Sequence, residues 1–370
     1  MFSQKQQQAL SRLAHALIDQ KQARVLIPPN KPQDGFWFGG GDLAQDTHGV
    51  LWLVGRYRNF GDSRTGLHAG ERGLECALFR SDDGGTSFTK VRSWSKADLS
   101  YDGRDVLSIE GTSLHQLPDG TWELFVSSEK KQAYPADITD FQKPGTGVWS
   151  LDRMTGAAPD TLDAETLQPV LSEQPPAEYL HVKDPVVYDA VDGSTHLIFC
   201  THPFTWAASN SGLAVRQSTE QHFHVTQWQM VARGAAWDVA ATRITGHLPV
   251  PAVGMFVDAN PVTLYFYDGA ESMRSLEANS KAVVRPRGYS CEEIAATLMA
   301  WRDNPATLER MAPLQPMFTS PYGSGSSRYI KTLVTSEGIW ATWQQSQADH
   351  SQALAGRFLP MTKVKQLLGG

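Results

Sequence analysis

Three acidic residues occur at matching places in a repeated pattern. Asp42, Glu110 and Asp184 each precede an apolar stretch that leads through a glycine turn into a second apolar stretch, and they are spaced by 68 and 74 residues. Two neighbouring carboxyl groups can cleave a glycosidic bond, because one protonates the leaving oxygen while the other activates water or attacks the anomeric carbon. A third can raise the pKa of the acid or hold sugar hydroxyls. Any one acid alone could equally cap a turn or bind backbone N–H groups, but the shared phase favours chemistry.

The repeat predicts the fold. Residues 39–58, 108–129 and 181–202 share the form strand, turn, strand, and the pattern continues at 248–269 and 326–345, where Arg328 occupies the place of the acids. A period of this size accommodates one four-stranded blade with its loops. We therefore expect an all-β, five-bladed β-propeller. Residues 23–29 should complete the last blade and close the ring, which removes exposed sheet edges.

In a propeller the innermost strands line a central channel, and equivalent positions meet at one mouth of it. The prediction is that Asp42, Glu110, Asp184 and Arg328 converge there.

Two segments outside the repeat carry their own patterns. Residues 2–18 place apolar side chains at helical spacing, so residues 1–22 are predicted as a short amphipathic helix packed on a single catalytic domain, residues 23–370. Residues 287–311 fit a helix or a pair of strands. Glu292 and Glu293 could face a substrate or lie solvated at a helix start. We favour strands, with both acids solvated or in salt bridges.

Composition limits the partners. A net charge of −6 argues against nucleic acid and membrane surfaces, which require a concentrated basic face, and favours a small carbohydrate. The N-terminal segment lacks the apolar run of a signal peptide, which predicts a cytoplasmic protein. Three cysteines, Cys76, Cys200 and Cys291, lie beside apolar residues and are expected to be buried thiols. The sequence shows no metal-ligand spacing, and no cofactor is expected.

Several further side chains are candidates for binding the substrate. Arg56 and Arg58 lie two residues apart, hence on one face of a strand, and with Arg328 they could clamp a carboxylate or sulfate, although salt-bridged arginines are commoner. Arg64 lies in the loop beyond them. Aromatic residues could stack on a sugar face or pack in the core. The remaining candidates for substrate binding are Trp37, Trp206, Tyr322, His181, Lys183 and His202.

The chain resembles the five-bladed propeller glycoside hydrolases, the superfamily of arabinanases, β-xylosidases and fructosidases. Ile109-Glu110-Gly111 is similar to the "EGP" segment that holds the general acid of arabinanase-like enzymes, and Lys183-Asp184-Pro185 is similar to the "RDP" segment of fructosidases. The resemblance implies Asp42 as base or nucleophile, Glu110 as general acid, and Asp184 as transition-state stabiliser and pKa modulator. Along this chain the acids run Asp, Glu, Asp, whereas those families usually have Asp, Asp, Glu.

Residues 81–88, SDDGGTSF, resemble the "Asp box" S-x-D-x-G-x-T-W, a structural turn of sialidase-like propellers. True sialidases resemble six-bladed rings with several boxes. The sequence therefore predicts a glycosidase, a hydrolase of glycosidic bonds in oligosaccharides or small glycosides. The alternatives are a sialidase-like or uronide-acting enzyme, either hydrolase or lyase, and a non-catalytic sugar-binding propeller.

Overall fold

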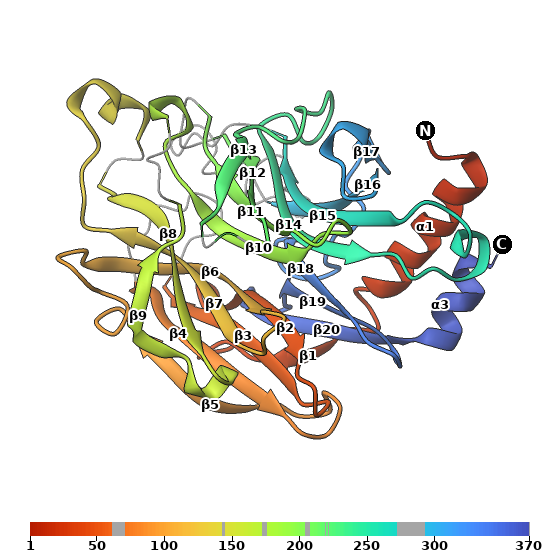
Figure 1. The fold of residues 1–370 in the computed structure, drawn as a ribbon, viewed down its shortest axis with the longest axis horizontal. Helices are drawn as coiled ribbons and strands as arrows, with labels where there is room; N and C mark the ends of the chain where they lie inside the picture. The colour runs from red at the N-terminus through yellow and green to blue at the C-terminus, as the bar shows by residue number, and fades with distance from the viewer. Residues whose placement is uncertain are drawn as a thin grey trace.

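The computed structural model describes residues 1–60, 71–142, 145–171, 176–203, 208–218, 220, 222–271 and 293–369. Strands dominate this part of the chain, and two α-helices accompany them (Figure 1). The all-β prediction is confirmed. None of the helices described is long and apolar enough to cross a membrane.

Consecutive strands pair antiparallel in short runs. The first run is β2 (Trp37–Gln45), β3 (Leu51–Asn59), β4 (Glu71–Ser81) and β5 (Thr89–Ser95). The second is β6 (Val106–Gln116), β7 (Trp122–Lys130), β8 (Val148–Gly156) and β9 (Asp163–Pro169). The third is β10 (Lys183–Asp189), β11 (Thr195–Thr201), β12 (Asn210–Arg216) and β13 (His224–Gln227).

The C-terminal half repeats this pattern. Strands β14 (Ala241–Pro249), β15 (Val262–Ala270), β16 (Ile294–Trp301) and β17 (Glu309–Arg310) form one run. Strands β18 (Ser327–Val334), β19 (Gly338–Ser346) and β20 (Gln352–Pro360) form the next, and β1 (Arg24–Ile27) pairs with β20. The predicted pairing of residues 23–29 with the last strands is thus present.

The pairing as a whole gives one twelve-stranded sheet and two four-stranded sheets among the described strands, and these sheets do not close. The number of blades therefore stays a prediction. The first strands of the runs nevertheless lie against one another: β2 contacts β6, β6 contacts β10, β10 contacts β14, β14 contacts β18, and β18 contacts β2. Equivalent positions on these five strands are thereby brought together.

Each of these five strands carries an irregularity in its pairing at a similar place. The register shifts between Gly39 and Asp42 in β2, between Ile109 and Thr112 in β6, and between Lys183 and Val186 in β10. Strands β14 and β18 shift in the same way after Ile244 and Arg328. A β-bulge turns side chains away from the regular alternation. The bulges therefore decide which residues of the inner strands face the interior.

The predicted amphipathic helix is present as α1 (Gln4–Leu17), with Ser3 as its N-cap in a capping box. Its apolar face, Leu10, Leu13 and Leu17, is fully buried in a core shared with β19, β20 and the C-terminal helix α3 (Met361–Leu368). Figure 1 shows the two helices side by side, close to both ends of the chain. Their burial against the sheet, rather than helical propensity, stabilises helices of this length.

The segment with ambiguous periodicity is a strand where it is described. Strand β16 begins at Ile294, a short 3-10 turn follows at Pro305–Thr307, and β17 follows, which agrees with the strand interpretation. Glu293 makes salt bridges, as expected, with Arg243 and Arg328. Glu292 and residues 287–291 lie outside the described residues.

The turn between β4 and β5 is tied by side chains of the predicted Asp box. Asp83 accepts hydrogen bonds from the hydroxyls of Ser81 and Ser87 and from the Ser87 N–H, while Gly85 N–H donates to Ser81. These bonds lower the pKa of Asp83 to about 2. Arg24 also donates to the Gly85 and Thr86 carbonyls of this turn. The kinship of the turn with the sialidase motif stays a prediction. Cys76 and Cys200 are buried free thiols, whereas Cys291 lies outside the described residues.

Candidate functional site

Charged residues from the first and second strands of the runs gather around the aromatic ring of Tyr329. We call this group the Tyr329 cluster; its members come from β3, β6, β10, β14, β15 and β18, and Glu293 directly precedes β16. They are Arg56, Glu110, Asp184, Arg243, Asp268, Glu293, Arg328 and Tyr329.

The backbone of two members is held in an unusual conformation. Asp184 has φ +54° and Tyr329 has φ +55°, and both lie in the bulges of their strands. Non-glycine residues rarely adopt this left-handed region, and such strain is typical of functional sites. The tight fit continues at Gly111, where an added Cβ would lie 2.7 Å from Asp184 Oδ1. Gly111 N–H donates to that same oxygen at 3.2 Å. The bulge of β10 thus turns the Asp184 side chain toward Gly111 and the Tyr329 cluster.

Three guanidinium groups surround the Tyr329 ring. The Cζ atoms of Arg243, Arg56 and Arg328 lie 4.5, 5.3 and 5.6 Å from its centroid. Each is within the range of a cation–π contact. Burial raises the pKa of the Tyr329 phenol, so it is neutral. The ring therefore separates the cations and keeps them in fixed positions.

Glu110 is the ionised carboxylate of the cluster. Its Oε2 lies 3.4 Å from Arg56 Nη2, and its Oε1 accepts a hydrogen bond from the Ser108 hydroxyl at 2.7 Å. Burial alone would raise the pKa of Glu110, but Arg56, Arg58 and Lys183, together with Ser108, lower it to about 2. A carboxyl group with this pKa holds no proton to donate at neutral pH.

Asp268, which lies beside Glu293, is the opposite case. Asp268 Oδ2 and Glu293 Oε2 lie 2.9 and 2.8 Å from the same nitrogen, Arg243 Nη2. Asp268 also accepts the Tyr329 N–H. Burial raises the pKa of Asp268 and the charge of Glu293 raises it further, so that despite Arg243 it reaches about 6. Asp184 also pairs with Arg243, and Glu293 also pairs with Arg328. Burial and the nearby charge of Glu293 therefore favour a proton on Asp268 up to a pH of about 6.

Asp42 lies on the far side of Lys331, away from this cluster. Its Oδ2 accepts a hydrogen bond from the Ser113 hydroxyl at 2.6 Å and lies 3.9 Å from Lys331 Nζ, which donates to the Pro185 carbonyl. Burial lowers the pKa of Lys331. The Lys331 ammonium therefore stands between Asp42 and the bulge of β10.

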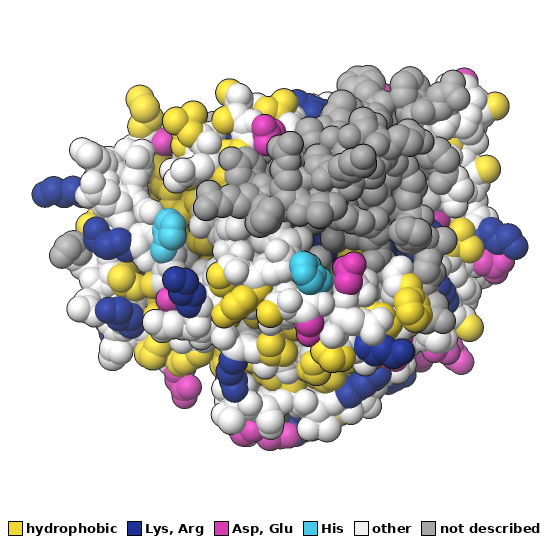
Figure 2. Space-filling view, turned by 180° about the vertical axis from the view of Figure 1, so that it is seen from behind, with side chains coloured by type: hydrophobic (Ala, Val, Ile, Leu, Met, Phe, Trp, Pro, Cys, Tyr) yellow, Lys and Arg dark blue, Asp and Glu magenta, His cyan; other side chains and the backbone are white. Residues whose placement is uncertain are grey.

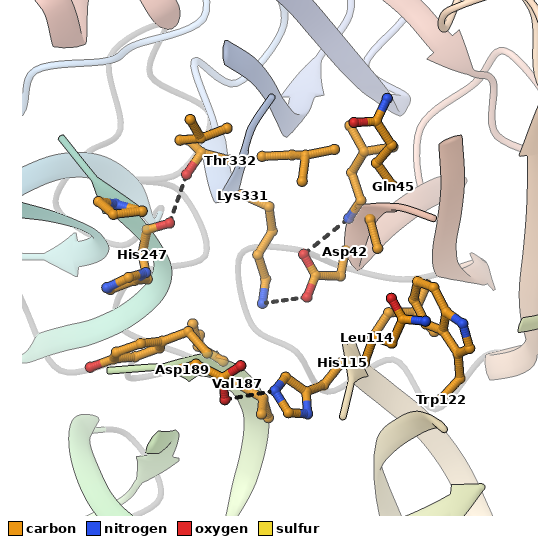
Figure 3. Close-up of a pocket in the computed structure, with 18 residues that line it drawn as sticks. Asp42, Gln45, Leu114, His115, Trp122, Val187, Asp189, His247, Lys331 and Thr332 are labelled. Carbon is orange, nitrogen blue, oxygen red and sulfur yellow. Dashed lines mark hydrogen bonds and ion pairs between the residues drawn. The ribbon is translucent and has the colours of Figure 1, made fainter. Parts of the chain in front are cut away.

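Asp42 instead faces a pocket at the other ends of the inner strands, with a volume of about 350 Å³. Figure 3 shows Asp42 and Lys331 side by side in this pocket, with His115 and Asp189 across from them. His115 lies between Glu123 and Asp189, and although burial opposes it, these carboxylates raise its pKa. We call this the Asp42 pocket. Of the four residues predicted to converge, three lie in the Tyr329 cluster, namely Glu110, Asp184 and Arg328. The fourth, Asp42, faces the Asp42 pocket instead.

Trp37 and Arg58 lie beside the Tyr329 cluster. Trp37 is buried, and the guanidiniums of Arg58 and Arg328 lie 4.5 and 5.0 Å from its ring. The Nε and Nη2 atoms of Arg58 are buried and have no hydrogen-bond partner among the described residues. Burial, together with Arg56, Arg72 and Arg328, lowers the pKa of Arg58 to about 10, although Glu110 opposes the change. Trp37 thus packs against arginines, while Arg58 lacks a counterion among the described residues.

The other predicted binding residues occupy the same end of the strands. His181 and His202 are buried with ring centroids 5.2 Å apart, and Tyr134 Oη lies 2.8 Å from His181 Nδ1. Lys183 Nζ lies 5.1 Å from the Trp149 ring. Tyr322 is in the loop before β18 and is 43% exposed. Arg64 and Trp206 lie outside the described residues. Among the described ranges, no group of three or more His, Cys, Asp and Glu is arranged to hold a metal ion.

The sequence patterns do not identify Arg243, Asp268 and Tyr329. They predict the fourth repeat at 248–269, whereas its first strand is β14, Ala241–Pro249, and residues 250–261 form a long connection. Counting back from the turn therefore bypasses Arg243, which holds the inner-strand position in that repeat. Tyr329 directly follows Arg328, and only the bulge in β18 turns it inward.

No family model matches the sequence, and no curated protein matches it. Solved structures share its fold. An α-L-arabinofuranosidase from Lactobacillus brevis is 11% identical with a TM-score of 0.56, covering 90% of this chain and 92% of the other. The β-1,2-mannobiose phosphorylase from Listeria innocua, bound to β-1,2-mannobiose, is 12% identical with a TM-score of 0.55, covering 93% and 96%. A further structure, described only as a glycoside hydrolase, is 10% identical with a TM-score of 0.63, covering 97% and 96%.

Proposed function

We propose that this chain is a glycoside hydrolase that acts at the Tyr329 cluster on an oligosaccharide or small glycoside. The observation that carries the proposal is that the carboxyl groups around the Tyr329 ring have very different pKa values. Glu110 has a pKa of about 2, while the Asp268–Glu293 pair shares a nitrogen and Asp268 has a pKa of about 6. Carboxyl groups whose pKa values are pushed apart are what acid–base cleavage of a glycoside requires.

The roles follow from protonation and access. Glu110 is ionised and 14% exposed, so it serves as the base or nucleophile. Asp268 is completely buried, whereas Glu293 is 12% exposed and lies on the same nitrogen of Arg243, so we assign Glu293, the member that a substrate can reach, as the general acid. In the reaction the glycosidic oxygen takes a proton from Glu293 as its bond to the anomeric carbon breaks. Either water attacks the carbon and passes its proton to Glu110, or Glu110 attacks the carbon and forms a glycosyl ester. In the second case water then hydrolyses the ester, which frees Glu110, and the proton of the water passes to Glu293.

The structures of similar fold support this substrate class. Two of them are named as an arabinofuranosidase and a mannobiose phosphorylase, enzymes whose names refer to sugars. Arg243 and Asp184 contribute position rather than proton transfer, since their ion pair at 3.2 Å is buried and fixes the bulge of β10 beside Glu110. Binding groups held this rigidly match the demand for a preorganised site.

A panel of aryl glycosides tests the proposal. It includes α-L-arabinofuranoside, β-D-xyloside, β-fructoside, β-glucuronide and sialoside, and the wild type is expected to release the aryl group from at least one. Glu110→Gln and Glu293→Gln should each lower kcat by roughly 10²- to 10⁴-fold with the fold intact, because proton transfer contributes about that factor. Gln116→Ala, at the opposite end of β6, is the matched control and should keep its activity.

Two other outcomes would replace the proposal. Tight binding of one sugar with no cleavage of any glycoside would indicate a non-catalytic sugar-binding protein. An unsaturated product that absorbs in the near ultraviolet would indicate a lyase acting on uronides.

A further inference from the structure

Arg58 differs from the neighbouring arginines in having no acidic partner among the described residues. Arg56 pairs with Glu110, Arg72 pairs with Glu129 at 2.7 Å, and Arg328 pairs with Glu293 at 2.9 Å. Arg58 makes no ion pair and no hydrogen bond to any described residue, and two of its nitrogens, Nε and Nη2, are buried. A buried charged donor without an acceptor is costly, so this group requires an explanation.

The surroundings of Arg58 hold its guanidinium in place. It lies opposite Trp37 in the pairing of β2 with β3, and its Cζ is 4.5 Å from the centre of that ring. The other residue over this ring, Arg328, belongs to the Tyr329 cluster. Arg58 as a whole is half-buried rather than fully enclosed. Its position is therefore fixed, adjacent to the proposed cleavage site and partly exposed.

The charges around Arg58 favour an anion. Burial lowers its pKa to about 10 together with repulsion from Arg56, Arg72 and Arg328, and the charge of Glu110 opposes this change. An added negative charge would supply the missing acceptor and relieve this repulsion. The guanidinium fork binds planar two-oxygen groups through two parallel hydrogen bonds, which an ammonium cannot do.

We propose that Arg58, supported by Trp37 and Arg72, forms an oxyanion subsite that takes the carboxylate of an acidic sugar. The proposal deepens the proposed function, on which it rests for its place beside Glu110, since it names the substrate class as uronic acid glycosides. Inorganic phosphate carries the same oxyanion chemistry and would make the same site one for phosphorolysis. The test therefore separates these two sources.

The experiment is titration calorimetry of the full chain with D-glucuronate, D-galacturonate, D-glucose and inorganic phosphate. A uronate is expected to bind more tightly than glucose. Arg58→Met should weaken that binding roughly 10- to 100-fold, which corresponds to the loss of charge-assisted hydrogen bonds. Arg58→Lys, which keeps the charge without the fork, should fall between. Arg80→Met is the control, because Arg80 also lies over a tryptophan, Trp52, but is far along β4 and exposed.

The outcomes distinguish this proposal from the previous one. Binding of phosphate alone, lost in Arg58→Met, would support the oxyanion subsite and overturn the acidic sugar. Binding of none of the anions, or binding equally strong in Arg58→Met, would overturn the subsite. Cleavage of a neutral glycoside without uronate binding would leave the hydrolase standing and overturn only this inference. Arg58-dependent uronate binding without any cleavage would leave the oxyanion subsite standing and overturn the hydrolase.

Discussion

Asp268 and Glu110 hold protons with very different strength, and the pH dependence of activity should show it. Above a pH of about 6, Asp268 loses its proton and the negative charge beside Glu293 increases, so kcat/KM is expected to fall as the pH rises through this value. Glu110 stays ionised down to a pH of about 2, so no loss should occur between pH 3 and 5 for as long as the fold persists. A pH–rate profile with an aryl glycoside measures both limbs. Activity rising through pH 6 would contradict the assigned roles.

Arg58 is expected to lower the free energy of unfolding when no anion is bound to it. Its replacement in Arg58→Met removes an unpaired charge and keeps the apolar stem over Trp37, so the free energy of unfolding is expected to rise by about 1 kcal/mol or more. Urea unfolding of the unliganded protein measures the change. Arg56→Met, which leaves Glu110 without its partner, should instead lower stability. A loss of stability in Arg58→Met would show that Arg58 has a structural role.

At the scale of single elements, the bulges of the inner strands position the site. An alanine at residue 111 would place its Cβ 2.7 Å from Asp184 Oδ1 and 2.9 Å from Asp184 Cα, so Gly111→Ala must displace the bulge of β10. We expect kcat to fall at least tenfold, with a smaller change in the melting temperature than in a core substitution. Asp119→Ala, in the turn that follows β6, is the control. Unchanged kcat in Gly111→Ala would mean that Asp184 is not needed for turnover.

Helix α1 is predicted to contribute stability without contributing to the site. Leu13 is fully buried in the core that α1 shares with α3 and the last strands, so Leu13→Ala should lower the free energy of unfolding by about 2 to 5 kcal/mol. The exposed control, Lys5→Ala, should change it by less than about 0.5 kcal/mol. Denaturant unfolding checks both, and activity at low temperature should be unchanged. A loss of activity in the folded Leu13→Ala protein would contradict this separation.

These elements also show how far the sequence can be interpreted. The strand pairs of the first three repeats are visible because alternating apolar residues and a glycine turn recur in each, and α1 is visible from its 3.6-residue period. The fourth repeat is misplaced by the sequence pattern because its two inner strands are joined by residues 250–261 rather than by a tight turn. Bulges are a property of pairing, not of one strand, so the inward turn of Tyr329 and the outward turn of Asp42 toward its own pocket leave no local signal.

At the scale of the whole molecule, each of the two ends of the inner strands carries a possible site. At one end Tyr329 is surrounded by charges, and at the other Asp42 opens into a pocket of about 350 Å³. Figure 2 shows basic and acidic side chains of the described residues interspersed over one face. We assign the chemistry to the Tyr329 end because only there, among the described residues, does a carboxyl group with a lowered pKa lie in one cluster with a carboxyl group whose pKa is raised.

A crystal structure of the Glu293→Gln variant with its bound glycoside tests this placement most directly. We predict a sugar ring beside Tyr329, with the glycosidic oxygen within hydrogen-bonding distance of residue 293 and the anomeric carbon facing Glu110. A sugar bound instead in the Asp42 pocket, between Lys331 and His115, would contradict the central claim and assign the chemistry to the opposite end of the strands.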